Sequence, residues 1–135
     1  MLKLIIGVKG TGKTKSLINL VNTASAESKG DVVCIEKGVK LRYDVKSSVR
    51  LIDTEEYFVA DTDALYGFVA GILASNHDIT DLFVDSALKI CNNDVAAFDE
   101  FVELVAKLAE KFEVNIVMTS SIPVEEATEV VKKYI

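Results

Sequence analysis

The chain has 135 residues, which is enough for one ordinary domain and too few for two. Half of the residues are hydrophobic and 27% are charged, a composition that provides a core and excludes extensive disorder. The formal net charge is −6, and the lysines and arginines are scattered, which argues against a surface built to bind nucleic acid. We therefore expect a single folded domain spanning residues 1–135.

The cysteines and the apolar segments indicate the environment of the protein. Cys34 and Cys91 lie far apart in apolar stretches, so we expect two buried free thiols rather than a disulfide or a metal site. The apolar start is too short for a signal peptide, and the longest uncharged apolar run, residues 66–74, is too short to cross a bilayer. We expect a soluble, cytoplasmic protein without a membrane span.

Strand-like and helix-like segments alternate from the beginning of the chain. Residues 2–6 form a short apolar run that ends at a glycine and predict a first strand. Helical spacing follows over residues 13–24, and the β-branched residues 31–35 predict a second strand. A weaker third strand is expected at residues 49–52. Residues 36–48 mix lysine, arginine, aspartate and serine, and they predict a mobile loop over the edge of the sheet.

The alternation continues in the middle of the chain. Asp61 or Asp63 is a candidate N-cap for a helix whose apolar face runs from Leu65 to Ile72. Residues 82–84 then predict a fourth strand, which ends at an aspartate.

The last third of the chain completes the pattern. Asn93 and Asp94 are candidate N-caps of the clearest amphipathic helix. Residues 114–118 predict a fifth strand, and Pro123 opens a final helix that runs to about residue 133. Strands separated by helices predict parallel pairing through right-handed crossovers. The expected fold is α/β, with three α/β/α layers around a mostly parallel five-stranded sheet.

The clearest motif lies between the first strand and the first helix. Residues 7–14, here called the phosphate loop, read G-V-K-G-T-G-K-T and match G-x-x-x-x-G-K-[ST] at every specified position. Gly7, Gly10 and Gly12 allow a tight turn that points consecutive backbone N–H groups at one anion. The helix that follows adds the positive end of its dipole at the same point.

The side chains of this segment predict the remaining contacts to a nucleotide. Lys13 is expected to reach the β- and γ-phosphates, and the hydroxyl of Thr14 to bind Mg²⁺. Lys9, Thr11 and Lys15 stand beside these residues and are further candidate phosphate contacts. The motif therefore predicts ATP, or a related nucleotide, and Mg²⁺ as ligands.

A Mg²⁺–nucleotide site also needs a carboxylate at the end of a nearby buried strand. Asp85 follows the fourth strand and is the first candidate, while Asp53 is a competitor that the neighbouring Arg50 weakens as the end of a buried strand. Thr119, after the fifth strand, is a candidate to sense the γ-phosphate or to orient water. A helix cap before Pro123, best supplied by Ser121, is the alternative role for these hydroxyls.

With these residues in place, the chain resembles the P-loop NTPases, and its order of elements looks like the RecA-like additional-strand group. The secretion and twitching-motility ATPases are members of that group. The resemblance is specific over the phosphate loop and at Asp85, and it implies nucleotide binding. It also implies that the strand with Thr119 lies between the strand before the phosphate loop and the strand before Asp85.

The sequence departs from that group where a water-polarising residue is expected. Many of those ATPases have a glutamate directly after the metal-binding acid, and this chain has Ser86 there. Glu36, at the end of the second strand, or Glu55 is a candidate substitute as the catalytic base. An arginine finger could come only from Arg42 or Arg50.

Three functions follow as hypotheses. The first is slow ATP hydrolysis, and the second is a non-catalytic, nucleotide-dependent switch that meets a protein partner or a second copy of the chain. The third is a small-molecule kinase, for which two arginines are few. A GTPase is set aside, because the sequence lacks both the Asp-x-x-Gly switch and the Asn/Thr-Lys-x-Asp guanine reader.

Overall fold

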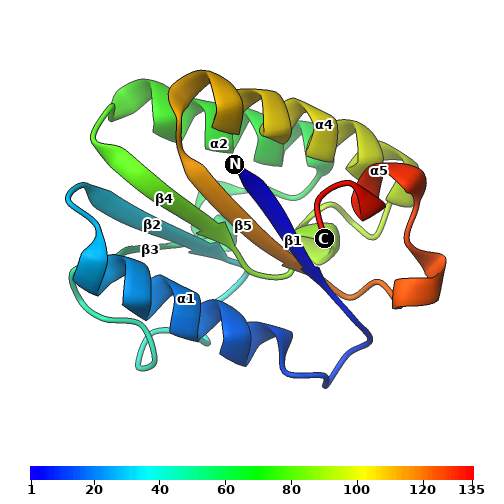
Figure 1. Ribbon diagram of the computed structural model, residues 1–135, viewed down its shortest axis with the longest axis horizontal. Coiled ribbons are helices and arrows are strands. Elements are labelled where there is room, and N and C mark those ends of the chain that lie inside the picture. The colour runs from blue at the N-terminus through cyan, green and yellow to red at the C-terminus, as the bar shows by residue number, and fades with distance from the viewer.

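Five strands form one sheet in the computed structural model, which describes residues 1–135 (Figure 1). The strands are β1 Leu2–Ile6, β2 Asp31–Glu36, β3 Arg50–Asp53, β4 Ile79–Val84 and β5 Asn115–Ser120. Their spatial order is β1-β5-β4-β2-β3, and every neighbouring pair is parallel. Because all strands run in the same direction, their carboxyl ends meet at one edge of the sheet, where ligands bind in open α/β folds.

The predicted α/β fold is confirmed, and the sheet is parallel throughout. The strand order agrees with the order that the resemblance implies, since β5 lies between β1 and β4. Ile6 pairs with Ser120 on one side of β5, and Val84 pairs with Met118 on the other. The carboxyl ends of these three strands are therefore neighbours.

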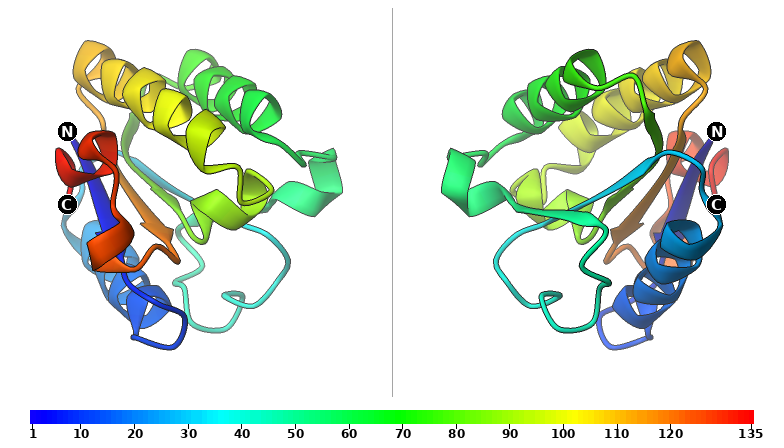
Figure 2. Two further views of the ribbon diagram at one scale, coloured as in Figure 1. Left: turned by 90° about the vertical axis from the view of Figure 1, so that its right-hand side faces the viewer. Right: turned by 90° about the vertical axis from the view of Figure 1, so that its left-hand side faces the viewer.

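Helices cover both faces of the sheet and give the expected three layers (Figure 2). Helix α1 (Lys13–Glu27) lies on one face, while α2 (Thr62–Ser75) and α4 (Val95–Phe112) pack side by side on the other. On the first face α1 buries Leu17 and Val21. The apolar stripe of α4 supplies the larger core and consists of Phe98, Phe101, Val102, Val105 and Ala109.

The element boundaries differ from the predicted ones by a few residues. Helix α1 continues to Glu27, and β4 begins at Ile79 because its first residues pair with the start of β2 despite the polar Thr80 and Asp81. Such shifts are usual at the ends of elements, where local patterns are weak. The short helix α3 (Ala87–Ile90) and the 3₁₀ helix Thr54–Tyr57 have no counterpart among the predicted elements.

The predicted N-caps are resolved to one residue in each case. The carboxylate of Asp61 accepts from the backbone N–H of Ala64 at 2.8 Å and starts α2. The carboxylate of Asp94 accepts from the N–H of Ala97 at 3.1 Å and starts α4.

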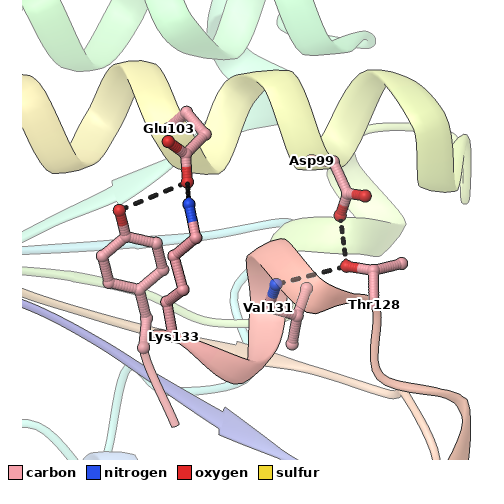
Figure 3. Close-up of polar contacts among 6 residues, drawn as sticks. Asp99, Glu103, Thr128, Val131 and Lys133 are labelled. Carbon is pink, nitrogen blue, oxygen red and sulfur yellow. Dashed lines mark hydrogen bonds and ion pairs between the residues drawn. The ribbon is translucent and has the colours of Figure 1, made fainter.

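The prediction of one final helix over residues 123–133 is wrong. The segment forms a 3₁₀ helix, Val124–Glu126, and then a separate short helix, α5 (Glu129–Lys132), because Ala127 between them is extended. Thr128 caps α5 by accepting from the N–H of Val131 at 3.2 Å, and its hydroxyl donates to Asp99 of α4 at 2.8 Å (Figure 3).

A second contact also ties the end of the chain to α4. The ammonium of Lys133 lies 3.2 Å from the carboxylate of Glu103, which also accepts from the hydroxyl of Tyr134 (Figure 3). The carbonyl of Tyr134 then accepts from the N–H of Leu4 at 2.7 Å, so the chain end meets the outer edge of β1.

Residues 37–49, the 37–49 loop, connect β2 to β3 and contain no helix or strand, as expected. The segment lies at the edge of the sheet, as expected, and it is packed against the core. Leu41, Val45 and Val49 are buried and join the core beneath α1. The loop therefore takes the place of a second helix on that face of the sheet.

None of the helices has both the length and the apolar character that crossing a membrane requires. Both cysteines are free and buried, as predicted. Burial, with Asp85 and Glu36 nearby, raises the pKa of Cys34 to about 12, and burial raises that of Cys91 to about 11.

We expect neither thiol to react in the native protein at neutral pH. The thiolate is the reactive form, and burial both removes it and blocks access. Mass spectrometry after iodoacetamide treatment should show no modification of the native protein and two modifications in urea. Labelling of native protein at either site would contradict the buried core described above.

Candidate phosphate-binding site

The phosphate loop has the backbone geometry that the motif predicts. Gly7, Gly10 and Gly12 have φ values of +153°, +86° and +86°, which residues with a Cβ rarely adopt. A Cβ on Gly7 would also lie 2.7 Å from the hydroxyl oxygen of Thr11, which donates to the carbonyl of Val8 at 2.7 Å. The hydroxyl of Thr11 thus bridges back to Val8, and the absence of a Cβ on Gly7 leaves room for it.

The start of α1 adds a set of free donors to this loop. Gly12 precedes the helix without a side-chain cap, and the first turn of α1 contains no acidic residue. The first N–H groups of a helix have no partner within the helix, so they are available to an anion. The ammonium of Lys13 donates to the carbonyl of Val8 at 2.8 Å and therefore lies across the loop.

Asp85 lies at the end of β4 and faces the phosphate loop. Its carboxylate accepts from the hydroxyl of Thr14 at 3.2 Å and from the hydroxyl of Thr119 at 2.7 Å. Its backbone N–H donates to the carbonyl of Ile35 on β2 at 2.8 Å. The structure thus brings together three residues that the sequence predicts for the site, Asp85 after β4, Thr119 of β5 and Thr14 at the start of α1.

The hydroxyl of Thr119 binds the carboxylate of Asp85 and the backbone beside it. Its hydroxyl is buried, donates to Asp85 and accepts from the N–H of Ser86 at 2.7 Å. Ser86 has a φ of +56°, an uncommon value for a residue other than glycine, and this contact helps to hold that turn. We infer that Thr119 positions Asp85 and the turn that follows it.

These groups surround one cavity of about 450 Å³, here called the phosphate cavity. Its lining includes five lysines, from the phosphate loop, the start of α1, the 37–49 loop and α3: Lys9, Lys13, Lys15, Lys40 and Lys89. Asp85 is the only carboxylate among the lining residues. Gly10, Gly12, Thr14 and Thr119 also line the cavity, whereas Gly7 and Thr11 shape the loop behind it.

Glu36 does not line the phosphate cavity, although it was a candidate base. Its buried carboxylate accepts from the N–H of Lys40 at 3.0 Å and from the N–H of Leu41 at 3.1 Å. Burial raises the pKa of Glu36, the two backbone hydrogen bonds oppose this, and the nearby Asp85 and Asp53 add to it. Glu36 therefore acts on the backbone of the 37–49 loop.

The other candidates also lie elsewhere. Asp53, the competitor of Asp85, accepts from the N–H groups of Gly38 and Glu55 at the far edge of the sheet. Glu55 is exposed and lines a different cavity. Ser121 is exposed at the rim of the phosphate cavity and caps no helix.

Two lining residues, Lys40 and Lys89, are not among the site residues that the sequence predicts. Neither belongs to a recognised spacing, and Lys40 lies in a segment without periodicity. Only the fold brings them to the phosphate loop. A scan against protein-family models and a search of curated proteins found no match to this chain.

Replacement of Thr119 by valine should destabilise the protein, because it removes the buried hydroxyl that bonds both the carboxylate of Asp85 and the N–H of Ser86. Such a loss costs about 1–3 kcal/mol in the free energy of unfolding. Urea denaturation measures it, and Thr119→Ser, which keeps the hydroxyl, should recover most of the loss. Equal stability of wild type and Thr119→Val would contradict the positioning role.

Glu36 should make the free energy of unfolding depend on pH. Its pKa is raised in the folded state, so between the unfolded and folded pKa values the folded protein holds more protons. The contribution of Glu36 to the free energy of unfolding therefore rises as pH falls through the folded pKa, and it is lost as pH rises again.

Urea denaturation at a series of pH values tests this without nucleotide. The stability of wild type relative to Glu36→Gln should increase as pH falls from neutral through the raised folded-state pKa, since only wild type titrates at this position. A constant difference between the two proteins over that range would show that Glu36 keeps its ordinary pKa.

Proposed function

We propose that the chain binds a Mg²⁺–nucleoside triphosphate, with ATP as the preferred ligand, through the phosphate loop. The observation that carries this proposal is the charge of one cavity, in which five lysines and the start of α1 surround a single carboxylate. The whole chain has a net charge of −6, so this positive charge is local. A cleft lined by one sign of charge concentrates small ions of the opposite sign, and a triphosphate is such an ion.

Thr14 and Asp85 are the proposed ligands of Mg²⁺. Both supply oxygen atoms, which Mg²⁺ prefers, and these oxygens already lie 3.2 Å apart beside the phosphate loop. Held by these two residues, Mg²⁺ would supply positive charge that offsets the charge of the phosphates. The hydroxyl of Thr119 keeps the carboxylate of Asp85 oriented toward this position.

Turnover is proposed to be slow. A general base must lie within hydrogen-bond reach of the water that it activates. Asp85 is the only carboxylate that lines the phosphate cavity, and both carboxylate oxygens of Glu36 accept from backbone N–H groups. Neither Arg42 nor Arg50 lines the cavity, so the kinase hypothesis gains no specific support.

A nucleotide-dependent switch is the second candidate, and the 37–49 loop favours it. This loop brings Lys40 to the phosphate cavity and exposes the apolar side chains of Val39 and Tyr43, the latter 90% exposed. A protein partner, or a second copy of the chain, that binds these side chains would contact the segment that lines the nucleotide site. Ligand and partner would then be coupled through one loop.

We place this activity in the cytoplasm. Neither Cys34 nor Cys91 forms a disulfide, and disulfides are rare in cytosolic proteins. The same compartment supplies ATP and Mg²⁺, the two ligands proposed for the site.

Calorimetric titration with Mg-ATP, Mg-ADP and Mg-GTP tests the proposal. We expect micromolar binding of the adenine nucleotides and a loss of at least about tenfold in Lys13→Ala, because a hydrogen bond to a charged group is removed. Circular dichroism should show that the variant remains folded. Folded wild-type protein that binds none of the three nucleotides would overturn the proposed function.

A phosphate-release assay then separates the two candidates. Slow release by the protein alone supports an ATPase, whereas tight binding without release supports a switch. Fast release with a turnover of about ten per second, typical of evolved enzymes, would contradict the absence of a base at the cavity.

A further inference from the structure

The 37–49 loop carries three lysines, and each lines a different cavity. Lys37 lines a cavity of about 240 Å³ beside Phe58 and Asn92. Lys46 lines one of about 290 Å³ against β3. Lys40 alone among them lines the phosphate cavity. The conformation of the loop therefore selects one lysine for the candidate nucleotide site.

Glu36, at the end of β2, holds the backbone of the loop at Lys40. It is only 2% exposed, and its carboxylate accepts from the N–H of Lys40 at 3.0 Å and from the N–H of Leu41 at 3.1 Å. A buried carboxylate is costly unless it receives such bonds, so the bonds and the burial support each other. The backbone of Lys40 is thus held at the end of β2 while its side chain stays exposed.

Helix α1 fixes the loop from the other side. Leu41 is buried in the core beneath α1 together with Leu17. The side-chain amide of Asn22 donates to the carbonyl of Asp44 at 2.9 Å and accepts from the N–H of Lys46 at 3.0 Å. Because α1 begins in the phosphate loop, the same helix holds both Lys13 and the 37–49 loop.

We propose that Lys40 binds the outermost phosphate of the nucleotide and that Glu36 is the residue that positions it. This inference rests on the proposed function. The N–H groups of the phosphate loop enclose the inner phosphates, so a cation from a separate segment meets the outer end of the chain of phosphates. No arginine lines the phosphate cavity, and Lys40 supplies from the same chain the charge that an arginine finger would bring.

Matched lysine variants test this proposal by calorimetry with Mg-ATP and Mg-ADP. Lys40→Ala should weaken Mg-ATP binding about tenfold or more, with a smaller effect on Mg-ADP, because a charge-assisted contact to the outer phosphate is lost. Lys46→Ala and Lys37→Ala remove the same charge from the same loop and should change both affinities less than about twofold. Lys40→Arg should retain most of the affinity.

The outcomes separate this inference from the proposed function. Wild-type binding that Lys13→Ala abolishes, with equal small losses in Lys40→Ala and Lys46→Ala, would overturn the role of Lys40 and leave the site intact. Equal losses of Mg-ATP and Mg-ADP in Lys40→Ala would overturn the assignment to the outermost phosphate. No binding by the wild type would overturn both.

A double-mutant cycle tests the positioning role of Glu36. Glu36→Gln should weaken Mg-ATP binding through Lys40, so the double variant Glu36→Gln/Lys40→Ala should bind like Lys40→Ala alone. A merely structural effect of Glu36 would instead add to the effect of Lys40→Ala. Additive losses would therefore overturn the positioning role, even if Glu36→Gln also lowers stability.

Discussion

The position of β5 between β1 and β4 is the constraint on which the candidate site depends. β1 leads into the phosphate loop and β4 ends at Asp85, yet these two strands are not neighbours. The register of β5 places Thr119 opposite Ile5 on one side and one residue beyond the pair of Met118 with Val84 on the other. From this position the hydroxyl of Thr119 donates to the carboxylate of Asp85 and fixes its orientation. The middle strand therefore sets the distance between the loop and the acid.

The location of the charged residues matters more than the net charge of the chain for the electrostatics of this protein. Acidic residues outnumber basic ones by 21 to 15, but the phosphate cavity has a single carboxylate. Asp53, Glu55 and Glu56 gather instead at the end of β3, on the far edge of the sheet. A long polyanion would meet the negative surface as well as the cavity, whereas a compact one meets mainly the cavity. The charge distribution thus favours the small anionic ligand proposed above over a long polyanion.

The sequence predicts the features that depend on local patterns. Glycine spacing determines the phosphate loop, and apolar periodicity determines the strands and long helices. Asp85 is predicted as a strand end, but its partners depend on strand order. Glu36 shows the limit, because its partners Lys40 and Leu41 belong to a loop whose conformation follows from burial under α1 and from no repeat in the sequence. The final helix fails for a similar reason, since contacts of Thr128 with α4 outweigh the local helical pattern.

β1 is one of the two edge strands, and its outer side has one backbone bond to the rest of the chain, from Leu4 to Tyr134. Proteins open locally where the fewest bonds must break, so we expect β1 to separate at a lower free energy than the central strands β4 and β2. The two halves of the candidate site thus differ in local stability, with the phosphate loop on the weaker half. A ligand held by both halves would protect β1 from hydrogen exchange far more than it protects the core.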